Sequence, residues 1–332
     1  MYKDIDKVVM FDTAIGSDNL GDEIIMNAVY REIKEIIEPY ILIKQSTHTP
    51  IMHLYQLLSF NDPVFNYYNE AKYKFIGGSN IFKKTLIARR ADWNINLLDK
   101  RFYKGSITIG CGSSLDDTLK LDSYTKKLYK SILNDKYIHS VRDEKTKRFL
   151  ESLGLKAYNT GCVTLWSMTP EMCENIPKQK SKSVVFTLTG YNPDYKNDKK
   201  MLDILVDNYE KIYFWPQSIG DLSYLKKIWL NKNNVFIIKP CLKAYEELLD
   251  SKSIDYIGTR LHGGICALQH MRRAIIITID NRAEDMNETN NLRCIKRNSI
   301  DSLLEKRINE YAGTKINVNI DLIKSWKEQF IK

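Results

Sequence analysis

The sequence predicts an α/β protein made of two doubly wound, Rossmann-like domains that face each other across a cleft. Short apolar runs typical of buried strands recur along the chain, each followed by a turn and then a segment with helical periodicity. The chain has 332 residues, of which 43% are hydrophobic, enough for about two domains of ordinary size. A stretch at 168–183, which contains Pro170, Pro177 and several lysines, is typical of a linker. We therefore expect domains at 1–168 and 169–332.

The first domain is expected to open with a strand at 8–11 and a loop at 13–20. The run 21–37 carries isoleucine and valine at helical spacing, with Asp22 and Glu23 in its first turn. Two further strands, at 75–76 and 107–109, run into Gly77-Gly78-Ser79 and Gly110-Cys111-Gly112, which we expect to be loops that a ligand or backbone can approach closely. A strand at 138–141 and a helix at 145–153 complete this part. The carboxylates Asp116 and Asp117, which follow the segment 110–112, are interpreted as solvated loop charge.

The second domain repeats the alternation. We expect strands at 184–186, 212–214, 235–238, 254–257 and 274–279. Helices are expected at 201–209, 222–230, 244–251, 265–270, 302–311 and 321–331.

Candidate site residues follow from this order, because ligands of doubly wound sheets bind beyond the carboxyl ends of the strands. The residues so placed are Arg142, Gln217, Ser218, Arg260, His262 and Arg282, with the glycine pairs Gly77-Gly78 and Gly263-Gly264. The three arginines are always charged and planar, which suits a carboxylate or phosphate ligand.

The sharpest local signal is the turn from Gly258 to Gly264. Arg260 would supply positive charge, His262 a group that transfers protons near neutral pH, and the two glycines exposed N–H groups at a helix N-terminus. The alternative is that the glycines only permit a tight turn while Arg260 pairs with Asp255 or Asp280. The residues leave both interpretations open.

The loop Gly16 to Asp22 is neither a dinucleotide fingerprint nor a P-loop, because G-x-G-x-x-G and Gly-Lys-Ser/Thr are both absent. In one interpretation Asn19 and Asp22 hold hydroxyls of a polar substrate. In the other, the loop is a glycine-rich turn capped by Asp18 or Asn19.

Charge and cysteine usage exclude several classes of protein. The formal net charge is +9, and the excess is divided almost evenly between the two parts of the chain, unlike a basic tail. No zinc knuckle or basic-aromatic repeat supports nucleic-acid binding. The six cysteines form no C-x-x-C pair and do not combine with histidines at zinc-ligand spacing, so no metal is predicted. Without a visible signal peptide or membrane-spanning run, we expect a cytoplasmic protein.

Taken in order, these motifs resemble the polysaccharide pyruvyl transferase family. The resemblance rests on Asn19-Leu-Gly-Asp22, Gly77-Gly78-Ser79, Ser140-Val-Arg-Asp143, Trp215-Pro-Gln-Ser218 with Asp221, Thr259-Arg-Leu-His-Gly263 and Asp280-Asn-Arg282. The Arg-Leu-His-Gly element is the most specific part. The family usually has a third glycine where Ser79 stands, and often an aspartate where Cys162 stands.

The resemblance implies a GT-B-like fold and transfer of pyruvate from phosphoenolpyruvate onto two hydroxyls of a sugar. Arg142, Arg260 and His262 fall on the family's donor-binding and catalytic positions. The donor would be held by the second domain and the acceptor, a glycan or lipid-linked sugar, by the first. No cofactor is implied beyond the donor substrate, and peripheral contact with the inner face of the membrane is expected. The rival interpretations are a nucleotide-sugar glycosyltransferase of the same fold and a non-catalytic glycan-binding relative.

Overall fold

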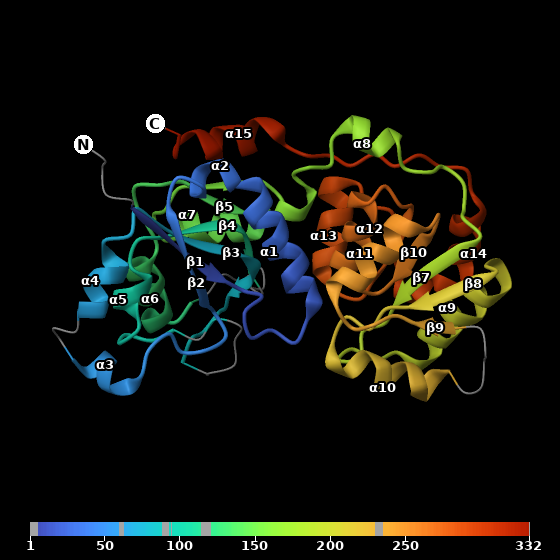
Figure 1. Cartoon of the computed structure of the whole chain (residues 1–332), viewed down its shortest axis with the longest axis horizontal. Coiled ribbons are helices and arrows are strands. Elements are labelled where there is room, and N and C mark those ends of the chain that lie inside the picture. Colours follow the sequence, from blue (N-terminus) through green and yellow to red (C-terminus); the bar gives the residue numbers. More distant parts are fainter. Residues whose placement is uncertain are drawn as a thin grey trace. The chain divides into compact units, whose positions relative to one another are not determined.

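The computed structural model describes residues 6–59, 63–87, 93, 95–113, 121–229 and 235–331, with backbone alone at Asn281 and Arg282. These residues form two compact units, each built on a six-stranded parallel sheet with helices packed against it (Figure 1). Unit 1 contains Met1–Ser17, Ile25–Trp166 and Asn319–Lys332, and unit 2 contains Asp18–Ile24 and Ser167–Val318. The carboxylates Asp116 and Asp117 lie outside the described residues. The predicted α/β class with two Rossmann-like sheets is confirmed.

Unit 1 has the strand order β2-β1-β3-β4-β5-β6. Its strands are β1 (Lys7–Asp12), β2 (Ile41–Ser46), β3 (Tyr73–Phe82), β4 (Ser106–Ser113), β5 (His139–Val141) and β6 (Ala157–Asn159). Its helices are α2 (Lys34–Ile37), α3 (Leu54–Leu58), α4 (Pro63–Asn69), α5 (Lys100–Tyr103), α6 (Ser123–Ile132), α7 (Glu144–Ser152), η1 (Val163–Leu165) and α15 (Ile320–Glu328). Helix α1 (Leu20–Glu32) begins in the segment that clusters with unit 2.

Unit 2 has the strand order β12-β11-β10-β7-β8-β9. Its strands are β7 (Ser183–Thr187), β8 (Lys211–Phe214), β9 (Val235–Ile237), β10 (Asp255–Gly258), β11 (Ala274–Thr278) and β12 (Cys294–Lys296). Its helices are α8 (Pro170–Glu174), α9 (Tyr195–Asn208), α10 (Ile219–Ile228), α11 (Leu242–Ser251), α12 (Leu261–Gln269), α13 (Asn281–Asn290), η2 (Arg297–Ser299) and α14 (Ile300–Asn309). This is the Rossmann order, in which the chain starts at a central strand, builds outward and then reverses direction at that strand.

Each unit has its own apolar core, because the central strands are buried on both faces. In unit 1, Val9, Phe11 and Ile76 pack with aromatic side chains of the flanking helices. In unit 2, Phe186 and Phe214 lie on neighbouring strands with ring centroids 5.0 Å apart. Two independent cores match the two domains' worth of apolar residues in the sequence.

The division of the chain differs from the predicted boundary at 168/169 in two places. The C-terminal helix α15 belongs to unit 1, where Trp326 is fully buried and donates its indole N–H to the carbonyl of Ile138 at 2.7 Å. The segment 18–24 belongs to unit 2, because Leu20 N–H bonds to the carbonyl of Gln217 at 2.9 Å. The predicted linker contains helix α8, whose cap is the side chain of Thr169.

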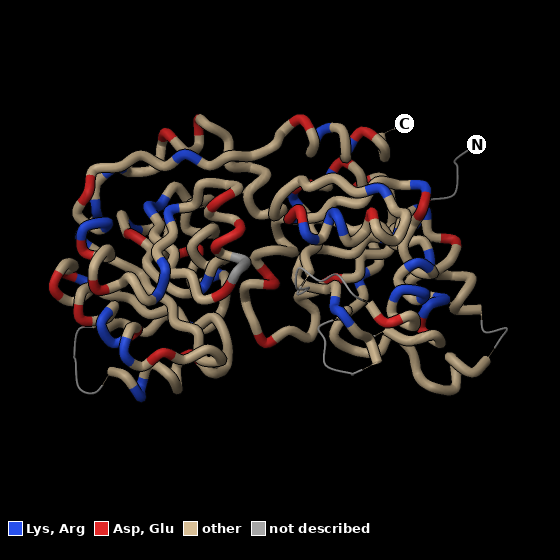
Figure 2. The backbone as a smooth tube through the Cα atoms, turned by 180° about the vertical axis from the view of Figure 1, so that it is seen from behind, with Lys and Arg blue, Asp and Glu red and all other residues tan. Residues whose placement is uncertain are grey.

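Lys and Arg residues are spread over the elements of both units, with acidic residues among them (Figure 2). This agrees with the even charge distribution in the sequence. In the described part of the chain, no helix has the length and apolarity needed to cross a membrane.

The expected glycine loops at 77–79 and 110–112 are strands in the structure, which corrects that prediction. Strand β3 continues through Gly77 and Gly78 to Phe82, and β4 continues through Gly110. The glycines permit close packing: an added Cβ at Gly77 would lie 2.2 Å from Sδ of Met26, and one at Gly78 would lie 2.9 Å from the carbonyl oxygen of Gly110. In unit 1 these two candidate substrate-binding glycines therefore bring a helix and a neighbouring strand against β3.

Ser79 follows this pair with a φ of 146°, in the region that only glycine enters without strain. The ladder between β3 and β4 is also irregular here, since its register shifts between Ser79 and Phe82. The position at which the family usually has a glycine thus carries a strained serine.

We expect Ser79→Gly to stabilise unit 1. Strain of this kind costs about 1–3 kcal/mol, whereas glycine in a strand loses about 0.5–1 kcal/mol, so the net gain should be about 1 kcal/mol. Thermal or urea unfolding would measure it. The matched control is Ser183→Gly in β7, where φ is not positive and the same change should destabilise the protein. Equal destabilisation by both substitutions would contradict the strain argument.

His139 in β5 is fully buried and neutral. Its Nδ1 accepts the backbone N–H of Thr108 at 3.2 Å, and its Nε2 lies 2.8 Å from the carbonyl oxygen of Asn134, to which it donates. Burial lowers the pKa of the His139 imidazole from 6.5 to about 4, because the buried ring would lose hydration on becoming charged.

This histidine should make unit 1 sensitive to acid. The unfolded chain takes up a proton at about pH 6.5 and the folded one only near pH 4, so folding stability falls as the pH drops between these values, by about 3 kcal/mol in all. Urea unfolding at pH 7 and pH 4.5 would measure the loss. His139→Gln, which cannot titrate, should show a smaller loss, and an equal loss in the variant and the wild type would contradict the assignment to His139.

Candidate functional site

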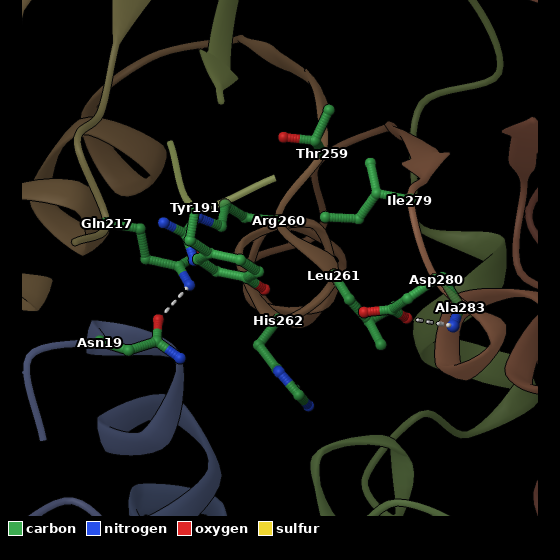
Figure 3. A pocket seen from close by; sticks show the side chains of 10 residues that line it. All are labelled: Asn19, Tyr191, Gln217, Thr259, Arg260, Leu261, His262, Ile279, Asp280 and Ala283. Carbon is green, nitrogen blue, oxygen red and sulfur yellow. Dashed lines mark hydrogen bonds between the residues drawn. The ribbon is translucent and has the colours of Figure 1, made fainter. Parts of the chain in front are cut away.

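A small pocket lies in unit 2 beyond the carboxyl ends of β7, β10 and β11. Its lining comes from Asn19, Tyr191, Gln217, Thr259, Arg260, Leu261, His262, Ile279, Asp280 and Ala283 (Figure 3). The strand order reverses between β7 and β10, and open α/β sheets bind ligands at such a switch point. Thr259 and Arg260 directly follow β10, and Tyr191 follows β7 after three residues. Sheet topology thus gathers these side chains.

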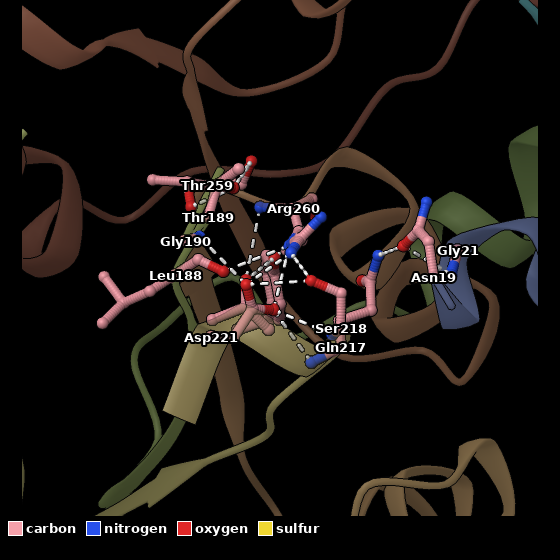
Figure 4. Close-up of polar contacts among 12 residues, drawn as sticks. Asn19, Gly21, Leu188, Thr189, Gly190, Gln217, Ser218, Asp221, Thr259 and Arg260 are labelled. Atoms are coloured by element: carbon pink, nitrogen blue, oxygen red, sulfur yellow. Dashed lines mark hydrogen bonds and ion pairs between the residues drawn. The ribbon is translucent and has the colours of Figure 1, made fainter. Parts of the chain in front are cut away.

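The Arg260 side chain forms an ion pair and several hydrogen bonds at the pocket (Figure 4). It is 3% exposed, and its partner in the ion pair is Asp221, which is fully buried. Nε lies 3.1 Å from the carbonyl oxygen of Leu188 and 3.2 Å from Oδ2 of Asp221, while Nη2 donates to Oδ1 of Asp221 and to Oγ of Ser218. Two guanidinium nitrogens are therefore held by protein groups, and the carboxylate neutralises the charge.

Asp221 also organises the backbone around the arginine. It accepts the N–H groups of Gly190 at 2.9 Å, Gln217 at 3.1 Å and Ser218 at 3.0 Å. Ser218 is the N-cap of α10, and Asp221 completes its capping box. One carboxylate thus joins the loops that follow β7 and β8 to the arginine that follows β10.

The third guanidinium nitrogen, Nη1, forms no hydrogen bond with the residues that the structure describes. The guanidinium carbon lies 5.0 Å from the centre of the Tyr191 ring, a cation–π distance, and Tyr191 is largely exposed. The guanidinium is paired with Asp221 rather than with Asp255 or Asp280, and Nη1 is the nitrogen left for a ligand.

His262 lies in the first turn of α12, which begins at Leu261 rather than at the predicted residue 265. It is 7% exposed and lines the same pocket as Arg260, with its imidazole pointing away from the Arg260 guanidinium (Figure 3). An imidazole and a positioned guanidinium therefore line one small pocket, which suits proton transfer near an anionic group.

Gly263 and Gly264 lie inside α12 and are buried, rather than in an open turn before the helix. The Gly264 N–H donates to the carbonyl of Arg260 at 3.2 Å, and the Gly263 carbonyl accepts from Tyr245 Oη at 2.8 Å. An added Cβ at Gly264 would lie 2.6 Å from Cγ1 of Ile276. These glycines let α12 pack closely on the sheet, which brings Arg260 and His262 to the pocket.

Asn19 has the capping geometry of the alternative interpretation. Its Oδ1 accepts the N–H of Gly21 at 3.1 Å and Nε2 of Gln217 at 2.9 Å, and an added Cβ at Gly21 would lie 2.8 Å from that same Nε2. Asn19 lines the pocket together with Gln217, whereas Asp22 does not. Oδ1 of Asn19 thus already has partners that belong to the protein.

The side chain of Gln217 carries a buried oxygen that accepts no hydrogen bond from the described residues. The side chain is 3% exposed, and the oxygen is its Oε1. Buried acceptors are normally satisfied, so this oxygen is suited to a donor on a ligand.

The remaining predicted residues lie elsewhere. Arg142 belongs to unit 1, where it is buried, donates to Oδ1 of Asn80 and lies 3.7 Å from a carboxylate oxygen of Asp143. Arg282 lies in α13, and its side chain is outside the described structure. Of the three predicted arginines, the described pocket contains only Arg260.

The proposed alternative partners of Arg260 are engaged elsewhere. Asp255 pairs with the buried Arg273, at 3.0 Å from Nη1. Asp280 accepts the N–H of Ala283 at 3.4 Å at the start of α13, and it also lines the pocket.

Among the residues of the site that the sequence did not assign to it are Asp221, which was named only as part of a family motif, and Tyr191. The Ser218-x-x-Asp221 spacing is a capping-box signal, which predicts the helix start but not the arginine that the same carboxylate binds. Tyr191 follows a buried strand, and only the parallel pairing of β7 with β10 brings it near Arg260.

Comparisons with known proteins agree with this architecture. The family model for polysaccharide pyruvyl transferase matches residues 19–281, more than half of the chain. No curated protein sequence matches the chain.

Several solved structures resemble the fold, among them the following two. The S. aureus MnaA–UDP co-structure has a TM-score of 0.55 and 11% identity over 96% of this chain and 94% of that one. Methanocaldococcus jannaschii UDP-GlcNAc 2-epimerase, in complex with UDP-GlcNAc and UDP, has a TM-score of 0.54 and 11% identity over 98% of this chain and 99% of that one. At such identity the likeness shows the fold alone, and it confirms the predicted GT-B-like class.

We expect Asp221→Asn to destabilise unit 2 by about 3–5 kcal/mol, because it leaves the buried Arg260 charge without a counterion. Urea unfolding of the purified variant would measure this. The control is Asp194→Asn, which removes a charge at the N-cap of α9 but substitutes another good capping residue, and should cost less than about 1 kcal/mol. Similar losses in both variants would show that Asp221 is only a helix cap.

Proposed function

The chain belongs to the polysaccharide pyruvyl transferase family, and we propose that it transfers pyruvate from phosphoenolpyruvate to a sugar of a cell-surface polysaccharide or of its lipid-linked precursor. The product is a pyruvate ketal, and phosphate is released. The observation that supports this proposal is the shared position of Arg260 and His262 in one pocket at the switch point of unit 2.

The proton balance of this reaction requires a group like His262. Two sugar hydroxyl oxygens form bonds to C2 of the donor, and the bond from C2 to the phosphate oxygen breaks. Of the two hydroxyl protons, one ends on the methylene carbon, which becomes a methyl group, and the other leaves with phosphate. A histidine that accepts and returns protons near neutral pH suits one of these transfers.

Arg260 is suited to the anionic part of the donor in a particular way. Asp221 and Ser218 fix the guanidinium plane, so Nη1 is held in one orientation before a ligand binds. A hydrogen-bond donor that is already oriented stabilises developing negative charge at little reorganisation cost. In this reaction that charge is on the departing phosphate. Since Asp221 neutralises the charge of the pair, selectivity for an anion would come from hydrogen-bond geometry more than from net charge.

The edge of the pocket is suited to a sugar. The exposed ring of Tyr191 offers an apolar face, and Oε1 of Gln217 offers an unsatisfied acceptor for a hydroxyl. We assign the donor to Arg260 and His262, and the acceptor hydroxyls to the side of Gln217 and Asn19. Arg142, Gly77 and Gly78 are not part of the proposed site, because in unit 1 they have structural contacts of their own.

His262→Gln separates chemistry from binding. Glutamine keeps polarity and approximate size but cannot carry a proton, so turnover should fall by about 10²–10⁴ while phosphoenolpyruvate affinity stays within a few fold. Calorimetry of phosphoenolpyruvate binding and steady-state phosphate release with a panel of lipid-linked and free glycans would measure the two. Arg260→Lys is less informative, because it also removes the contacts to Asp221 and Ser218.

The control is His53→Gln, an exposed histidine of unit 1, which should leave both quantities unchanged. Thermal unfolding with phosphoenolpyruvate or UDP-GlcNAc separates the rival function. A rise in melting temperature with UDP-GlcNAc alone would favour a nucleotide-sugar enzyme, and a folded His262→Gln variant with wild-type turnover would exclude the catalytic assignment.

A further inference from the structure

A second cluster of reactive side chains lies at the other end of α12. One ligand-type atom from each of Glu246, Cys266 and His270 lies within 4.8 Å of the other two, the one such group of three among the described residues. Cys266 and His270 are four positions apart at the C-terminal end of α12, on one face of the helix, and Glu246 faces them from α11. The two helices are already joined near this point, where Tyr245 Oη donates to the carbonyl of Gly263 at 2.8 Å.

The three types of ligand atom in this cluster are those that bind zinc. A thiolate, an imidazole and a carboxylate are the ligands that zinc prefers, and zinc is usually tetrahedral. With metal–ligand bonds of about 2.0–2.3 Å, ligand atoms around a tetrahedral zinc lie roughly 3.3–3.8 Å apart. The three atoms in this cluster therefore need to move by only about 1 Å to reach that geometry.

An independent contact orients the histidine as metal sites require. Nδ1 of His270 lies 2.6 Å from Oδ1 of Asp250, which is one turn beyond Glu246 on α11. Metal-binding histidines commonly donate their other ring nitrogen to a carboxylate, which fixes the tautomer and raises ligand basicity. With Nδ1 protonated by this contact, Nε2 carries the lone pair that can bind a metal.

The three side chains of the cluster differ in exposure, and the more exposed ones leave a route for an ion from solvent. Cys266 is 2% exposed, whereas Glu246 and His270 are only partly buried. An ion could therefore enter from solvent and meet the thiolate at the closed end. Thiolate and carboxylate together balance a divalent charge, so the filled site would be neutral.

We propose that Glu246, Cys266 and His270 bind a zinc ion that links α11 to the C-terminal end of α12, with Asp250 orienting His270 and water in the fourth position. The sequence predicted no metal because the ligands come from two helices and lack short Cys/His spacing. The ion would hold α12 at the end opposite to His262. This inference does not depend on the proposed function, because the cluster lies outside the pocket.

The test uses Co²⁺ added to the full-length protein without a polyhistidine tag. A tetrahedral site with a thiolate should give one equivalent of binding, visible d–d bands and a near-ultraviolet sulfur-to-cobalt band, all lost when Zn²⁺ is added. Cys266→Ser should abolish the sulfur band, and Glu246→Gln and His270→Gln should each weaken Co²⁺ binding at least tenfold. Zn²⁺ should also raise the melting temperature of the wild type but not of these variants.

The matched control is Cys241→Ser, because Cys241 is an exposed cysteine outside the cluster. It should leave the cobalt spectrum unchanged. Loss of the sulfur band in Cys241→Ser, its persistence in a folded Cys266→Ser variant, or absence of a cobalt spectrum from the wild type would overturn the proposal. If Cys266→Ser does not fold, Glu246→Gln and His270→Gln decide: full cobalt affinity in both would overturn it.

Discussion

The buried ion pair between Arg260 and Asp221 is the constraint on which the site of unit 2 depends. Removing both charges from water is costly, and the pair is tolerated because almost every oxygen and nitrogen in it has a defined partner. Those partners are backbone groups of the loops after β7 and β8, and Arg260 itself follows β10. The same contacts that offset the desolvation cost therefore fix the loops that line the pocket.

Close packing places the other side chains around this pair. Gly263 and Gly264 are buried inside α12, and the missing side chains allow the helix to approach Tyr256 and Ile276 of the sheet. That approach brings His262 to the pocket that Arg260 also lines. Gly21 acts similarly, since its missing Cβ leaves room for the amide of Gln217. Glycines in these motifs thus position other residues of the site.

Different reactive side chains lie at the two ends of α12. The N-terminal end carries Arg260 and His262 at the pocket, and the C-terminal end carries Cys266 and His270 toward α11. A helix transmits position along its axis because its backbone hydrogen bonds resist deformation. An ion bound at Cys266 and His270 would therefore restrain the element from which His262 projects, while leaving the chemistry of the pocket to its own residues.

The sequence by itself determined the α/β class, the main buried strands and the motif order, because apolar periodicity and turn residues are local properties of the chain. Strands β2, β6 and β12 lie at sheet edges and were not predicted; edge strands are short or partly exposed, so their apolar signal is weak. Only the tertiary structure decided that Arg260 pairs with Asp221 and that Glu246 faces Cys266 and His270. These pairings join residues 20 or more positions apart, and their geometry is fixed by packing of the sheets and helices, which no local pattern encodes.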